Sequence, residues 1–150
     1  MTMKKISLAL ATILLIAVAP SASADEASDR AAKAAAVASR WNPVFDQQYL
    51  QITALASKAA LDPSVLKSYK NLLADFLEVR RVIDSSLASP TGDIDAASAY
   101  AEEETGEFTM TISELSKQVA KIKTISCVKG KAIKKASGIT PKCPAGYKKK

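Results

Sequence analysis

The stretch that decides the fold is DPSVLKSYKNLLADFLEVRRVIDSSL, residues 62–87. It opens with Asp62-Pro63, a helix cap followed by a proline at the first helical position. Apolar side chains then recur at alternating spacings of four and three residues: Val65, Tyr69, Leu72, Phe76, Val79, Ile83 and Leu87. This spacing puts them on one face of an α-helix, so the stretch predicts an amphipathic helix that must bury that face.

Similar stripes lie on both sides of this stretch. Before it, Asn42-Pro43 repeats the cap-and-proline pattern and predicts a helix that begins at Pro43. Its apolar stripe is Phe45, Tyr49, Ile52, Ala56 and Ala59. After it, the turn residues 89–92 precede Asp93, which we expect to cap a third helix. The third stripe is Ile94, Ala97, Ala101, Thr105, Phe108, Ile112, Leu115, Val119 and Ile122.

Stripes that repeat in sevens predict helices that bury their apolar faces against one another. We therefore expect a mainly α fold, an elongated, coiled-coil-like, up-down-up bundle of three helices joined by short connections. The third helix would span about 30 residues, near 45 Å at 1.5 Å per residue. The alanine-rich residues 25–40 also favour helix, but they carry few long apolar side chains. Whether residues 25–41 dock on the bundle stays open at this point.

The first residues predict export. Lys4 and Lys5 precede an apolar run at residues 6–18, and Ala22-Ser23-Ala24 supplies the small residues of a cleavage site. This is the pattern of a secretory signal peptide, cleaved before Asp25. The run is too short for a membrane span, which needs about 20 apolar residues. We therefore divide the chain into a signal peptide (1–24), a helical bundle (25–123) and a lysine-rich tail (124–150).

Charge is distributed unevenly along the chain. Residues 25–116 hold all 15 acidic residues against 8 lysines and arginines, a net charge of −7. Residues 117–150 hold 11 lysines and no acidic residue, a net charge of +11. The overall charge of +6 hides this contrast between an acidic body and a basic tail. Such asymmetry bears on partners and solubility rather than on fold.

The tail predicts a small β-hairpin closed by a disulfide. Residues 124–129 and 131–137 resemble short strands around Lys129-Gly130, a plausible tight turn. Cys127 and Cys143 are the only two cysteines, and in an exported protein a disulfide between them is the natural inference. The alternatives are two reduced thiols or a bridge between two molecules. Two thiols without any histidine leave too few ligands for a metal, so we expect no metal and no cofactor.

The tail also carries a resemblance. Residues 125–150, ISCVKGKAIKKASGITPKCPAGYKKK, resemble a short C-terminal module of exported actinobacterial proteins whose other parts differ from one another. The features that match are the Cys-Val-Lys-Gly-Lys opening, the Lys134-Lys135 pair and the ending from Pro141 to Lys150. The resemblance implies an extracellular or envelope setting and supplies no activity. The helical body resembles no family known to us.

A dense group of lysines outside the cell predicts electrostatic binding to anionic envelope polymers or to an anionic lipid surface. The candidate polyanion-binding residues are Lys129, Lys131, Lys134, Lys135, Lys142, Lys148, Lys149 and Lys150. The alternatives are a solvated tail that aids solubility and a tail that folds back onto the acidic body. Nucleic acid suits the charge but not the compartment, and the tail has little aromatic interleaving beyond Tyr147.

Catalysis is not expected. The chain has no histidine, and no serine, cysteine or lysine stands in a recognisable nucleophile setting. We therefore expect a non-enzymatic, secreted, envelope-associated protein whose bundle serves as a spacer or interaction module. The alternative is a secreted binding or chaperone-like module whose helix faces engage a partner protein. The sequence does not give the oligomeric state.

Overall fold

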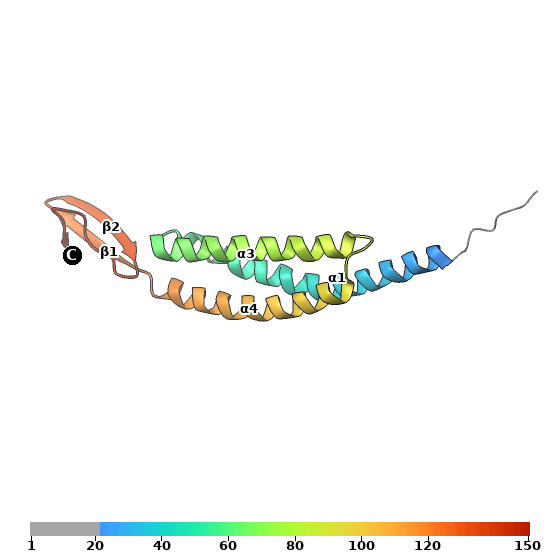
Figure 1. Ribbon diagram of the computed structural model, residues 1–150. Coiled ribbons are helices and arrows are strands. Elements are labelled where there is room, and N and C mark those ends of the chain that lie inside the picture. The colour runs from blue at the N-terminus through green and yellow to red at the C-terminus, as the bar shows by residue number, and fades with distance from the viewer. Residues whose placement is uncertain (1–21) are drawn as a thin grey trace, which may run out of the picture.

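A computed structural model describes residues 22–150 of the chain. Its helices are α1 (Ala22–Ala54), α2 (Ala56–Ala59), α3 (Pro63–Ala88) and α4 (Ile94–Ala120). Its strands are β1 (Lys123–Lys129), β2 (Ala132–Gly138) and β3 (Lys148–Lys149). The three long helices lie side by side, and the sheet extends beyond one end of them (Figure 1). The predicted mainly helical fold with a small antiparallel hairpin at the C-terminus is confirmed.

The predicted signal peptide falls outside the described residues, except for its last three, and stays a prediction. Among the helices of residues 22–150, none combines the length and the apolar character that crossing a membrane requires.

Helix α3 begins as its sequence predicts. The Asp62 carboxylate accepts hydrogen bonds from the backbone amides of Ser64, at 3.0 Å, and Val65, at 3.3 Å. These bonds satisfy two of the amides that a helix start leaves without partners. The predicted stripe supplies the residues that α3 buries: Val65, Leu72, Phe76, Val79 and Ile83.

The predicted start of the first helix at Pro43 is wrong. Helix α1 runs unbroken from Ala22, and Pro43 lies in its interior. A proline there lacks the amide that would bond the carbonyl of Ser39, four residues earlier. Pro43 and Ser39 are both exposed, so water can bond that carbonyl instead. The alanine-rich residues before the proline favour helix strongly enough to continue it, and α1 changes direction along its length (Figure 1).

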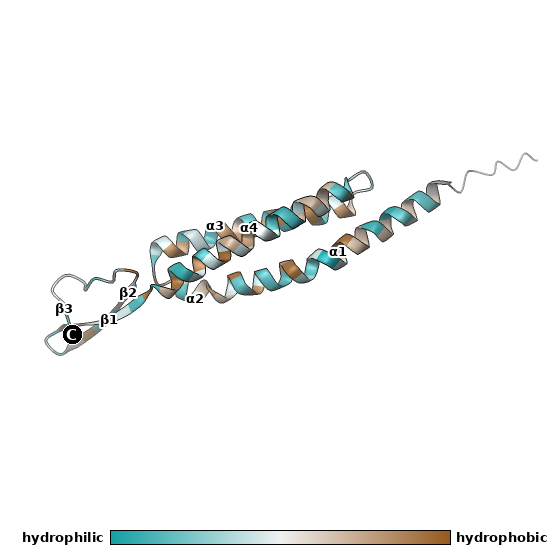
Figure 2. Cartoon of the chain, turned by 90° about the horizontal axis from the view of Figure 1, so that it is seen from below, coloured by the Kyte–Doolittle hydropathy of each residue, from teal (hydrophilic) through white to brown (hydrophobic). Residues whose placement is uncertain are grey.

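Aromatic side chains from all three long helices meet in the core. Phe76 of α3 is 1% exposed, and its ring centroid lies 5.8 Å from that of Phe45 in α1 and 5.1 Å from that of Phe108 in α4. Edge-on and tilted ring pairs of this kind stabilise a core beyond the area that they bury. Figure 2 shows apolar and polar residues alternating along each helix, as amphipathic helices require.

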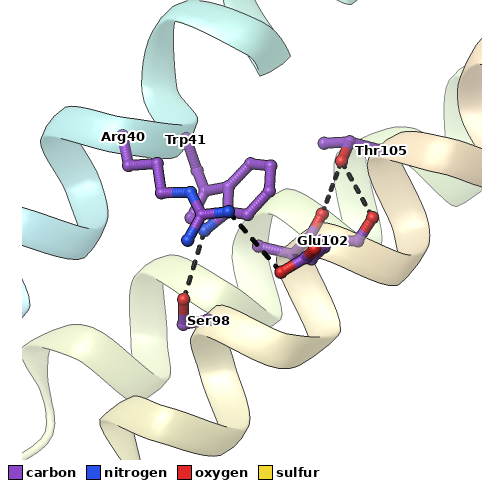
Figure 3. Close-up of polar contacts among 6 residues, drawn as sticks. Arg40, Trp41, Ser98, Glu102 and Thr105 are labelled. Carbon is purple, nitrogen blue, oxygen red and sulfur yellow. Dashed lines mark hydrogen bonds and ion pairs between the residues drawn. The ribbon is translucent and has the colours of Figure 1, made fainter.

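Polar contacts join α1 to α4 beside this core. The Trp41 indole Nε1 donates a hydrogen bond to the Ser98 hydroxyl at 3.3 Å, and the Arg40 guanidinium lies 4.5 Å from the indole ring centroid (Figure 3). Arg40 also pairs with Glu102 at 3.6 Å. The Trp41 side chain is only 8% exposed, so it packs as part of the core.

The alanine-rich part of α1 docks on the bundle. Arg30 donates to the carbonyls of Ser86 and Ser89 at the end of α3. Farther along, Lys33 pairs with Asp95 of α4 at 2.6 Å, and Val37 packs against the core. Residues 24–29 remain exposed. Of residues 25–41, those from Arg30 onward therefore dock on the bundle, which the sequence had left open.

The sheet has the strand order β2-β1-β3, and both pairs of strands are antiparallel. Lys129 pairs with Ala132, which leaves a two-residue loop. Gly130 is the first loop residue, with φ +58°, and Lys131 keeps a negative φ. This is the pattern of a type II′ turn, which requires glycine at that position. The predicted hairpin is confirmed, whereas β3 was not predicted.

Candidate polyanion-binding site

The disulfide between Cys127 and Cys143 closes within one chain, as predicted. Cys127 lies in the middle of β1, and its side chain is completely buried. The bond therefore draws residues 139–147 against one side of the sheet. Because a two-stranded hairpin is marginal alone, this covalent link and the added strand β3 help to hold its shape.

All eight candidate lysines lie on the sheet or on the segment attached to it, and all are exposed. Lys129 and Lys131 are at the turn, Lys134 and Lys135 are in β2, and Lys142 precedes Cys143. The last three residues return to β1: Lys148 and Lys149 form β3, and the Lys150 amide donates to the Ser126 carbonyl at 2.9 Å. The fold thus gathers lysines that lie up to 21 residues apart in the sequence.

The lysines occupy both faces of the sheet, because alternate residues of a strand point to opposite sides. Cys127 shares its face with its cross-strand partners Lys134 and Lys149. On this face the Lys134 ammonium lies 5.2 Å from the centroid of the Tyr147 ring, a cation–π contact. Lys135 and Lys148 belong to the opposite face. The eight candidate lysines therefore lie on both faces of the sheet and around its turn, and we call this group the knob.

In residues 22–150, the acidic body makes no ion pair with these lysines. Within the part of the chain that the structure describes, every ion pair joins residues of the helices: Lys33–Asp95, Arg40–Glu102, Arg80–Asp46, Arg80–Asp84, Arg81–Glu78 and Lys117–Glu114. None of the eight candidate lysines takes part. Within the described residues, the candidate lysines therefore make no direct ion pair with the acidic body.

The Asp62 carboxylate joins the sheet to the bundle by a hydrogen bond. While one Asp62 oxygen caps α3, the other accepts a hydrogen bond from the backbone amide of Ile139 at 2.9 Å. The bond from the Ser64 hydroxyl, followed by the Ile139 amide, lowers the pKa of Asp62 from 3.8 to about 2.

The contact leaves little room around it. A Cβ on Gly138 would lie 3.0 Å from the Asp62 carboxylate, and the φ of +152° at this glycine strains any other residue. The Ile139 side chain packs against the core of the bundle. The knob is therefore held at the end of the bundle, and the sequence pattern had indicated only the capping half of this contact.

No protein-family model, curated protein or solved structure matches this chain. The resemblance of residues 125–150 to a C-terminal module of exported proteins therefore stays a prediction. Within residues 22–150, no three side chains of histidine, cysteine, aspartate or glutamate are grouped in a way that could hold a metal ion.

Proposed function

We propose that this is an exported, non-enzymatic protein that associates with the cell envelope through its basic sheet. The observation that supports this function is the knob of eight exposed lysines, none of which is ion-paired in the described chain. The abundant polyanions outside a cell are phosphate-bearing wall polymers, acidic polysaccharides and anionic lipid head groups. Lysine meets such groups as a point charge, so the binding is salt-dependent and tolerant of the anion's exact chemistry.

The shape of the molecule gives the bundle a role in this setting. The sheet lies at one end of the helices and the N-terminal part of α1 at the other (Figure 1). An anionic surface attracts the sheet and repels the acidic body, which favours an end-on orientation. With 33 residues, α1 is about 50 Å long at 1.5 Å per residue. The bundle would then act as a spacer that displays its N-terminal end away from the surface.

Salt-dependent retention of the full-length protein on isolated native envelopes tests this function. One variant replaces three lysines of the knob with glutamine: Lys131, Lys135 and Lys142. The matched control replaces three exposed lysines of the helical body: Lys58, Lys67 and Lys70. Both variants lose the same net charge. We expect the knob variant to elute at clearly lower salt than the wild type, and the body variant to elute with the wild type. If the two variants elute together, the sheet is not the binding site.

A second candidate function rests on the exposed apolar side chains of the bundle. The Tyr49 ring stacks on Phe76 at 6.1 Å between centroids, which places this part of α1 beside α3. On these two helices, Tyr49 is 42% exposed, Leu50 67% and Leu77 50%. Such side chains could engage an apolar segment of a partner protein, as a chaperone-like module does.

Suppression of the aggregation of reduced insulin, followed by light scattering, tests the second candidate. We expect wild-type protein to delay aggregation and the Leu50→Ser, Leu77→Ser double variant to lose most of that effect. Equal behaviour of the two proteins would remove this candidate. The knob variant described above is the control for a purely electrostatic effect.

A further inference from the structure

One face of the sheet is left open. The disulfide draws residues 139–147 against the side that carries Cys127. On the opposite side, Val128 lies across from Ile133 in β2 and from Lys148 in β3, while Lys135 follows two residues along β2. Directly paired residues share a face at about 5 Å between Cβ atoms. The open face, as we call it, therefore combines two apolar side chains with at least two ammonium groups.

Ile133 is the exposed apolar residue of this face. Its side chain is 63% exposed, in a basic segment that otherwise exposes mostly lysine. A single exposed isoleucine is ordinary on a protein surface. Here, however, it lies two residues from Lys135 along β2 and close to the turn that holds Lys131, and Val128 of β1 separates it from Lys148 of β3. The hairpin carries this group beyond the ends of the helices, where it would be the first part of the molecule to meet a surface (Figure 1).

A soluble polyanion can use the lysines but gains nothing from the isoleucine. An anionic phospholipid layer can use both, because ammonium groups pair with lipid phosphates while an apolar side chain enters the boundary between head groups and acyl chains. A second copy of the chain fits poorly, since stacking two open faces would bring Lys135 and Lys148 of each copy together.

We propose that the open face binds the surface of an anionic phospholipid bilayer, with Ile133 inserted among the head groups. The inference rests on the proposed envelope function and names its target. Lys135 and Lys148 lie on the same face as the inserted side chain and pair with lipid phosphates.

The test compares two probes and two variants of the full-length protein. The probes are vesicles of phosphatidylglycerol and phosphatidylcholine, and soluble polyphosphate. Ile133→Thr removes apolar surface but keeps a β-branched residue, so the strand propensity is retained. Met110→Gln is the matched control, because Met110 is 68% exposed on α4, away from the sheet.

We expect Ile133→Thr to bind the anionic vesicles about fivefold more weakly than wild type. The reason is that the variant no longer moves the exposed part of an isoleucine side chain from water into the lipid. Its binding to polyphosphate, and the vesicle binding of Met110→Gln, should equal those of the wild type. Vesicles of phosphatidylcholine alone should bind neither protein tightly. Intact mass checks that the disulfide has formed in each variant.

Equal vesicle binding by wild type and Ile133→Thr, with polyphosphate binding retained, would overturn the lipid assignment and leave the envelope function standing. If the wild type binds neither the vesicles nor polyphosphate, both the lipid assignment and the envelope function are overturned. A dimer that forms only with Ile133 present would identify a second copy as the occupant. A measurement on wild type alone gives a further check: vesicle binding should persist at salt concentrations that dissociate polyphosphate, because insertion is not screened.

Discussion

Gln48 gives the sharpest test of how the bundle is packed. Its side chain is 5% exposed between α1 and α4. The amide Nε2 donates to the Thr105 carbonyl at 2.7 Å and to the Thr109 hydroxyl at 3.1 Å. The amide oxygen Oε1 is buried and has no hydrogen-bond partner within the described chain. The Gln48 side chain therefore has an amide nitrogen with two hydrogen-bond acceptors and an amide oxygen with no donor.

Replacing Gln48 with methionine removes the amide nitrogen and the amide oxygen together and keeps nearly the same side-chain shape. The variant loses two hydrogen bonds, each contributing about 1 kcal/mol net. It also removes an unpaired buried acceptor, which costs about 1–3 kcal/mol, and adds apolar burial in its place. The Thr105 carbonyl keeps the Thr109 hydroxyl as a donor at 2.8 Å, so no new unsatisfied group is created there. We expect Gln48→Met to be more stable by about 1 kcal/mol.

Urea unfolding measures this difference, with Trp41 fluorescence as the probe, because the single tryptophan lies in the same α1–α4 contact. Thermal unfolding should show a Tm raised by about 3–5 °C. Gln47→Met is the control, because Gln47 is exposed on the same helix and its replacement should change stability by less than about 0.5 kcal/mol. Gln48→Glu should have the opposite sign, lowering stability by about 3 kcal/mol through a buried charge.

A loss of stability in Gln48→Met would contradict this prediction. If Gln48→Met is less stable than wild type by more than about 1 kcal/mol while Gln47→Met is unchanged, then the two donated bonds outweigh the unpaired oxygen. The side chain would then hold α1 and α4 in register by a net favourable polar contact.

Three further predictions concern α1, the disulfide and the joint between sheet and bundle. Pro43→Ala should raise the free energy of unfolding by about 2–3 kcal/mol in urea, because the proline is exposed in a helix interior; no gain would mean that the bend is needed for packing. Replacing Cys127 and Cys143 with alanine should cost the sheet about 3 kcal/mol in the chain-entropy model. Hydrogen exchange should then show β1 and β2 losing protection while α3 keeps it, and loss of protection throughout would contradict this. The pKa of Asp62 is lowered from 3.8 to about 2, so the stability that its ionised form contributes is present above pH 3.8 and is lost as the pH falls through about 2. The Ile139 amide resonance should titrate near pH 2, and a midpoint near 4 would refute the assignment.

The sequence was sufficient for the parts of the fold in which local signals agree. Asp62 and Asp93 cap α3 and α4, and most residues of the two predicted stripes are buried. Tyr69, Leu87 and Ile122 are only partly buried, and Ile122 follows the end of α4. Residues 42–43 carried the same cap-and-proline signal, yet the chain continues as helix through them. The difference is that alanine-rich residues precede Pro43 and that Pro43 and Ser39 are exposed, so the missing hydrogen bond costs less than ending the helix. A cap-and-proline pattern alone does not show whether the missing hydrogen bond or the end of the helix costs more.

In the candidate site, the features that depend on residue type were predicted and those that depend on tertiary contacts were not. Lysine content and the cysteine pair predicted a charged, disulfide-closed hairpin, because both depend on residue type alone. Strand β3 is two residues long and has no periodicity to detect. The joint between Asp62 and Ile139 links residues 77 positions apart through a backbone amide, which every residue except proline can supply. No sequence signal marks such a bond, so the orientation of the knob could come only from the structure.

That joint changes how the charge asymmetry should be interpreted. A flexible basic tail could reach any anion around the acidic body, and its charge would act without direction. Here the carboxylate that begins α3 also holds Ile139, and Ile139 packs on the core, so the lysines keep a defined position at one end of the bundle. Removing the tail would also remove the packing of Ile139 and one of the four hydrogen bonds that the Asp62 carboxylate accepts, and would change the bundle as well as the charge. Substitutions of individual lysines are therefore the sharper experiment, because they alter the charge of the knob while its attachment stays intact.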